Sequence, residues 1–128
     1  MKKTSLILIV ALLLVFSAVS LMGCGLFKEI KFDEVKANLE NAGYQVTVLT
    51  GEEYVQREDA YPSIFASELE QYINAVKGED HIEIFFFTTV DIASSNANFI
   101  TGPGLYEGQS NKVVYIGTKQ ARSDAKIG

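Results

Sequence analysis

The sequence HIEIFFFT, residues 81–88, has the strongest β-strand character in the chain. β-Branched and aromatic residues dominate it, and neither glycine nor proline interrupts it. Because side chains alternate along a strand, one face carries Ile82, Ile84 and Phe86. The other face carries His81, Glu83, Phe85 and Phe87, polar at its start and aromatic further on. The segment therefore presents large apolar side chains on both faces of a sheet.

Two interpretations of the segment before this strand stay open. One helical face would carry the apolar residues Phe65, Leu69, Tyr72, Ile73 and Val76. Pro62 suits the start of such a helix. Residues 69–76 also suit a strand, and then Lys77-Gly78-Glu79-Asp80 is a hairpin turn with Gly78 at positive φ. The pattern favours a helix over 62–71 and leaves 72–76 to either state.

Further toward the amino terminus, apolar residues at helical spacing predict a helix over 32–42, which Gly43 ends. A strand is expected over 44–49, broken by Thr50 and Gly51. The charged stretch 52–60 lacks the spacing of a calcium loop and is expected to be a solvated loop or helical turn.

On the carboxy-terminal side, residues 91–100 have the pattern of a modest helix, and the composition of 101–111 predicts a loop. The glycines of that loop miss the spacing of a nucleotide-binding motif. A strand is expected over 112–117, followed by a short helix that Thr118 can cap.

This order of elements predicts an α+β fold. The expected architecture is a small mixed or antiparallel sheet of three to four strands with helices mainly on one face. Residues 32–128 are expected to form a single domain.

The chain begins with a positive segment and an uninterrupted apolar run over residues 6–16, which indicates an export signal. The run is shorter than the roughly 20 residues that a membrane-spanning helix needs. Its end precedes the only cysteine of the chain, Cys24, so no internal disulfide is available. An uncleaved amino-terminal helix and a reactive thiol are the alternative interpretations of this region.

The sequence Leu21-Met22-Gly23-Cys24 resembles the lipobox of bacterial lipoprotein precursors, with Met22 as a departure from the usual small or β-branched residue. The resemblance implies that residues 1–23 are a signal peptide and that Cys24 receives lipid. Residues 24–31 are then a lipidated tether to the cell membrane on the extracytoplasmic side. The segment order and the sequence VVYIGTKQA, residues 113–121, also resemble small uncharacterised bacterial lipoproteins. This resemblance implies no particular activity.

Charge and motif content argue against several function classes. Residues 24–128 contain nine basic and 16 acidic residues, a formal charge of −7 that disfavours nucleic-acid binding. Metal-binding, nucleophile and nucleotide motifs are missing from the sequence, and His81 beside Glu79, Asp80 and Glu83 suits a solvated hairpin end. We therefore expect no enzyme activity, no metal and no cofactor.

The leading functional hypothesis is a non-catalytic binding or interaction domain anchored at the membrane. Phe85 and Phe87, with Tyr115 from a neighbouring strand, are the candidate interface or ligand face, open to a second copy or an envelope protein. The alternative is that the 101–111 loop or the segment from Pro62 covers these rings within the chain. The alternative functions are an accessory or inhibitor of another envelope protein and, less favoured, a small hydrolase.

Overall fold

The computed structural model describes residues 29–127. The predicted signal peptide 1–23, Cys24 and most of the tether 24–31 lie outside the described residues. The described elements are α2 (Phe32–Asn41), β1 (Gln45–Thr50), α3 (Gly51–Val55), the 3-10 helix η2 (Ala66–Glu68), β2 (Leu69–Lys77), β3 (Asp80–Phe87), α4 (Val90–Ala97), β4 (Tyr106–Ser110), β5 (Val113–Gly117) and α5 (Lys119–Asp124).

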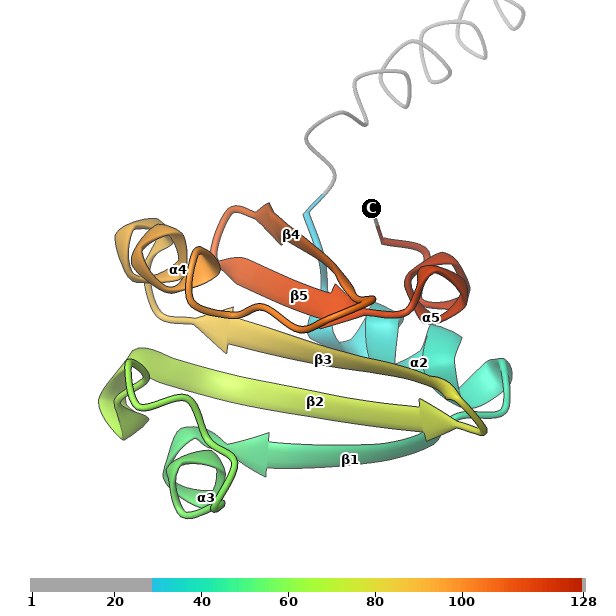
Figure 1. Ribbon diagram of the computed structural model, residues 1–128, viewed down its shortest axis with the longest axis horizontal. Coiled ribbons are helices and arrows are strands. Elements are labelled where there is room, and N and C mark those ends of the chain that lie inside the picture. Colours follow the sequence, from blue (N-terminus) through green and yellow to red (C-terminus); the bar gives the residue numbers. More distant parts are fainter. Residues whose placement is uncertain (1–28, 128) are drawn as a thin grey trace, which may run out of the picture.

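The strands form one sheet in the order β1-β2-β3-β5-β4, and every neighbouring pair is antiparallel. This arrangement confirms the predicted α+β class, although the sheet has five strands rather than three or four. Helices α3 and α4 lie in front of the sheet in Figure 1, whereas α2 and α5 pack on its other face. The expectation that helices would lie mainly on one face is wrong, because both faces are covered.

The alternation predicted for the central strand β3 is confirmed. Ile82, Ile84 and Phe86 belong to one hydrophobic cluster together with residues of α2 and α5. Phe85 and Phe87 belong to a second cluster on the opposite face. We call these two surfaces of the sheet the α2/α5 face and the α3/α4 face. Each is apolar enough to need a layer of its own, and this explains the three-layer arrangement.

The preferred helix over residues 62–71 is wrong. Apart from the 3-10 turn of η2, the chain there is irregular until β2 begins at Leu69. Tyr72 and Ile73 are consecutive and both fully buried, which a strand allows because one points to each covered face. The alternative hairpin is confirmed, since β2 pairs with β3 and Gly78 has a φ of 61° in the turn.

The loop expected over residues 101–111 contains strand β4. Its sequence, YEGQS, has no β-branched residue, and the strand exists because it pairs with β5 along its whole length. Gly108 is needed at its centre, because a Cβ there would lie 2.3 Å from the Tyr115 hydroxyl oxygen. The ring of Tyr115 therefore lies directly over the backbone of β4.

Three helices begin after a threonine whose side chain accepts a hydrogen bond from the first turn. Thr50 caps α3, Thr89 caps α4, and Thr118 caps α5 as predicted. At α3 the carboxylate of Glu53 also accepts from the Thr50 backbone amide, which completes a capping box. These caps fix where the chain turns from the sheet into each covering helix.

Candidate functional site

The hypothesis of an exposed aromatic face at Phe85 and Phe87 is wrong. Their side chains are 0% and 1% exposed. The ring of Tyr54 in α3 packs edge-on against Phe85 at 5.4 Å, and the ring of Tyr61 does so at 6.0 Å. Cover within the chain is confirmed, but these two rings come from residues before Pro62. Ile64, after Pro62, and Leu105, in the 101–111 segment, belong to or pack against the same cluster.

Tyr115, the third residue of that hypothesis, lies on the opposite face of the sheet. It pairs with Ile84 in the β3–β5 register and belongs to the α2/α5 cluster. The structure therefore does not bring Tyr115 together with Phe85 and Phe87. Its ring instead faces the guanidinium of Arg122 in α5, with 5.3 Å between the guanidinium carbon and the ring centroid.

A polar network crosses the α3/α4 face beside the two buried phenylalanines. Arg57 donates to the Tyr72 hydroxyl at 2.7 Å, and that hydroxyl donates to a Glu83 carboxylate oxygen at 2.5 Å. Asp59 accepts two further hydrogen bonds from Arg57. Burial and the nearby Glu83 carboxylate raise the pKa of Tyr72 far above its usual range. The network holds the loop after α3 against the sheet with a protonated tyrosine at its centre.

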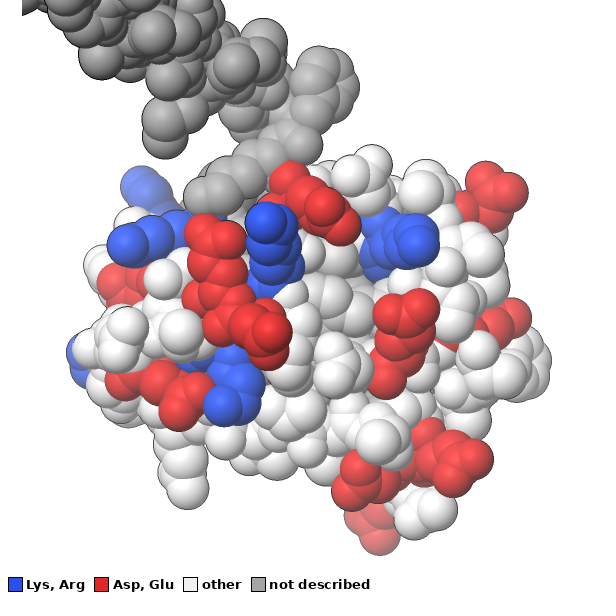
Figure 2. All heavy atoms as spheres, turned by 180° about the vertical axis from the view of Figure 1, so that it is seen from behind, with Lys and Arg blue, Asp and Glu red and all other residues white. Residues whose placement is uncertain are grey.

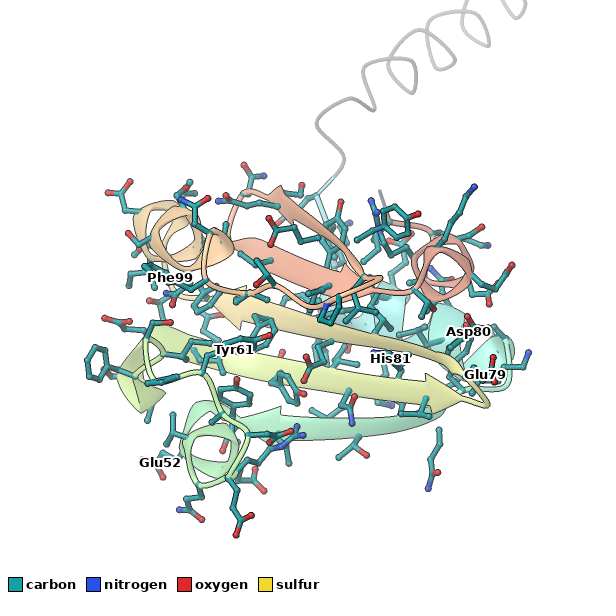
Figure 3. All side chains as sticks on the ribbon, viewed as in Figure 1. Glu52, Tyr61, Glu79, Asp80, His81 and Phe99 are labelled. Carbon is teal, nitrogen blue, oxygen red and sulfur yellow. The ribbon has the colours of Figure 1, made fainter. Side chains whose placement is uncertain are left out.

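His81 is half-buried at the start of β3, on the α3/α4 face of the sheet. Its neighbours Glu79 and Asp80 lie at the hairpin (Figure 3). Asp80 accepts a hydrogen bond from the Thr118 hydroxyl at 2.9 Å, so its carboxylate ties the hairpin to the start of α5. Within residues 29–127, no three His, Cys, Asp or Glu side chains are grouped so that they could hold a metal ion.

Strand β1 is one of the two border strands of the sheet, and most of its residues are exposed. It lies along the lower border of the sheet in Figure 1 and, among the described residues, pairs with β2 alone. Its sequence, QVTVLT, contains no charged residue and no proline. Val48 is 37% exposed, and Val76 on β2 is 41% exposed. An edge with these properties is suited to pairing with another extended chain.

The opposite border of the sheet differs from β1 in composition and surroundings. Strand β4 carries Glu107 at its second position and Gly108 at its centre. Residues 29–31 line a groove together with 110–112, the turn between β4 and β5. The described chain therefore enters the domain on the β4 side, away from β1 (Figure 1).

Sequence reasoning placed a strand at 44–49 but did not identify it as an edge. The signal available was its composition, because β1 lacks the bulky residues on both faces that mark β3 as central. Which strand pairs with which depends on contacts distant in sequence, so the accessible border emerges only from the fold.

Comparison of the chain with models of known protein families, with curated proteins and with solved structures found no match. Among residues 29–127, no helix is both long enough and apolar enough to span a membrane.

Proposed function

We propose that this chain is a membrane-anchored extracytoplasmic lipoprotein whose domain is a non-catalytic interaction module. In this proposal Cys24 carries the lipid, and the outer edge of β1 binds an extended segment of an envelope protein or of a second copy. The lipobox-like sequence at 21–24 supports the anchor. The uncharged, accessible strand β1 supports the interaction role.

The observation that carries the interaction role is the free border of β1. The outward-facing amide and carbonyl groups of an edge strand bind a partner strand by main-chain hydrogen bonds. Val48 and Val76 add exposed apolar surface next to that border. Recognition through the backbone suits a partner that is extended where it docks.

The place at which the described chain begins, at residue 29, agrees with this role. Four strand spacings of about 4.8 Å separate β1 from β4, so the docking edge lies about 19 Å across the sheet from the side on which the chain enters. An anchor at Cys24 would hold the β4 side toward the membrane. The edge of β1 would then face away from the membrane, where an extracytoplasmic partner has access.

Intact mass of the protein from its native host tests the anchor. We expect a diacylglyceryl addition on Cys24 and partition into detergent, because two acyl chains anchor a protein stably. The Cys24→Ser variant should remain as the unmodified precursor. Wild-type protein without a lipid mass on Cys24 would refute the anchored part of the proposal.

Photo-cross-linking in the native membrane tests the docking edge. A benzophenone amino acid placed at Thr47, on β1, should give a discrete adduct in the lipidated full chain. Val48→Lys should abolish the adduct, because a charge on the edge strand opposes pairing. Val90→Lys is the matched control, since Val90 is 45% exposed and lies on α4.

An adduct that persists in Val48→Lys, or no adduct at all, would contradict docking at β1. The mass of the adduct also identifies the kind of partner. A second copy of this chain would indicate a homodimer. An adduct with an exported enzyme would indicate an accessory or inhibitory role at the same edge.

A further inference from the structure

The charges of the domain differ between the two borders of its sheet. Residues 51–68, which run from α3 to η2 beside β1, contain five acidic residues and one basic residue. Residues 106–127, which run from β4 to the end of the described chain, contain four basic and two acidic residues. In Figure 2 basic side chains lie along the upper border with acidic ones among them, and the charged side chains at the lower border are acidic. An acidic domain therefore has a basic border on the β4 side.

Three exposed lysines form this basic border. Lys112 lies in the turn between β4 and β5, at one end of the border strand. Lys119 and Lys126 lie at the other end, where they line a cavity together with Tyr106. Within residues 29–127, none of the three lysines forms an ion pair. Their charges therefore flank β4 along its length of about 17 Å.

The two acidic residues of this region leave the basic border positive. Both carboxylate oxygens of Asp124 accept hydrogen bonds within the chain, from the Tyr44 hydroxyl at 2.8 Å and from the Gln120 amide at 3.0 Å. Glu107 is paired with Ile116, so its side chain lies on the α3/α4 face of β4. Neither carboxylate is paired with a lysine of the border in the described chain.

Tyr106 adds an exposed aromatic ring to the basic border. The residue begins β4 and is 52% exposed. Its ring centroid lies 5.7 Å from the guanidinium carbon of Arg122, and that carbon lies 5.3 Å from the ring centroid of Tyr115. This packing holds the Tyr106 ring in place at the surface. A tyrosine ring beside basic side chains suits the interface between lipid and water, because it is apolar with a polar tip.

The described chain begins on the same side of the molecule. Residues 29–31 line a groove together with 110–112, which includes Lys112. In the proposed lipoprotein Cys24 bears the lipid, and an extended chain advances at most about 3.6 Å per residue. Residue 29 then lies within about 18 Å of the lipid-bearing residue. The basic border is thus held near the lipid surface.

We propose that the basic border lies on a membrane surface that contains anionic lipids, an inference that rests on the proposed anchor at Cys24. The three lysines attract anionic headgroups over roughly the Debye length, about 10 Å at 0.1 M salt. Tyr106 places its exposed ring among the headgroups. The same surface repels the acidic segment 51–68. The tether limits the distance to the membrane, and the charges determine that the β1 edge faces away from it.

Relaxation enhancement by a gadolinium chelate on lipid headgroups tests this orientation by NMR. The lipidated full chain is placed in nanodiscs of phosphatidylglycerol mixed with phosphatidylcholine. We expect the enhancement at residues 106–112 and 119–126 to exceed that at 45–50 by about tenfold or more, because the borders lie about 19 Å apart and the effect falls steeply with distance. Nanodiscs of phosphatidylcholine alone, or concentrated salt, should reduce this difference.

A pair of double variants tests the role of the lysines. Lys119→Gln with Lys126→Gln should reduce the difference about threefold or more on anionic nanodiscs, because two attractive charges are lost. Lys36→Gln with Lys77→Gln is the matched control, since it removes the same charge from α2 and from the end of β2. Equal enhancement at the two borders, an unchanged pattern on neutral nanodiscs, or equal effects of the two double variants would overturn the proposal.

The anchor and the membrane-facing border fail in different ways. A chain without a lipid mass on Cys24 refutes the anchor and removes the basis of this inference with it. A lipidated chain whose β1 border receives as much enhancement as its β4 border keeps the anchor and refutes the membrane-facing border alone.

Discussion

The hydroxyl of Tyr72 joins the sheet to the loop that follows α3. It accepts a hydrogen bond from Arg57 and donates one to Glu83, and all three residues come from different elements or loops. Removing the hydroxyl leaves a guanidinium and a carboxylate without the group that links them. A single oxygen atom therefore contributes to how firmly the loop covers Phe85.

Tyr72→Phe should lower the free energy of unfolding by about 1.5–3 kcal/mol, the range for hydrogen bonds that involve charged groups. Tyr61→Phe is the control. Its hydroxyl makes one exposed bond, 3.3 Å long, to the Thr101 carbonyl oxygen, so we expect a much smaller loss. Urea denaturation of both variants measures the difference, and equal losses would mean that the network adds nothing.

Buried tyrosines also make stability depend on alkaline pH. Burial raises the pKa of Tyr54 to about 12, and the pKa of Tyr72 is raised further. In the unfolded chain both groups titrate near pH 10, so their contribution is complete below that pH. Above it the unfolded state loses protons first, and stability falls until the folded groups also titrate.

We therefore expect the free energy of unfolding to decline between pH 10 and 12 by about 1.4 kcal/mol per pH unit for each of these tyrosines. Urea denaturation at pH 9, 10 and 11 measures the slope. Tyr54→Phe should reduce this slope by the contribution of one tyrosine. A slope unchanged in that variant would show that Tyr54 is not shifted in the folded protein.

At the scale of elements, β3 determines the architecture because both of its faces are buried. Phe86 belongs to one hydrophobic cluster, and Phe85 and Phe87 belong to the other, so each face requires its own covering layer. Helices α3, α4 and α5 each begin at a threonine cap at or just after the end of a strand. Strand pairing places β3 at the centre of the sheet, and the caps begin helices that cover its faces, so the fold has three layers.

Phe85→Ala should cost about 3–5 kcal/mol, and Phe86→Ala on the opposite face a similar amount, because each leaves a cavity in a packed cluster. Phe65→Ala is the matched control, since that side chain is 64% exposed and should lose little. Thermal or urea denaturation checks all three. A negligible loss for Phe85→Ala would restore the discarded hypothesis of an open aromatic face.

At the scale of the whole molecule, two clusters share a single sheet. Tyr72 and Ile73 bury their side chains on opposite faces from adjacent backbone positions, so neither cluster can open without disturbing the other. This coupling predicts cooperative unfolding. It also leaves the borders of the sheet, and not its faces, as the places where a partner strand can dock.

Residues 25–128 produced without the signal and Cys24 should be soluble and unfold in one transition. Far-ultraviolet circular dichroism and tyrosine fluorescence should give the same midpoint in urea, because both clusters lose their packing together. Two separate transitions would show that the two faces of the sheet are independent, contrary to the shared burial along β2 and β3.

Local signals in the sequence predicted a large part of the fold. The faces of β3, the hairpin glycine and the Thr118 cap were all predictable, because each depends on residues within a few positions. The helix predicted over residues 62–71 was wrong, because the apolar residues there fit helical spacing although Leu69 and Gln71, at the end of the segment, pair with β3. The sequence did not predict β4, because its composition is weak for a strand. The strand forms through its pairing with β5, which is a contact between different segments.

For function, the sequence by itself determined the candidate anchor at Cys24, the acidic charge and the two-sided apolar strand at the centre of the fold. Only the tertiary structure decided that Phe85 and Phe87 are buried, that β1 is an accessible border, and that Arg122 lies between two tyrosines. The physical reason is the separation along the sequence over which each kind of interaction acts. Composition and alternation act between neighbours in the chain, whereas burial, edges and the aromatic cradle of Arg122 arise from segments that meet only after the sheet has formed.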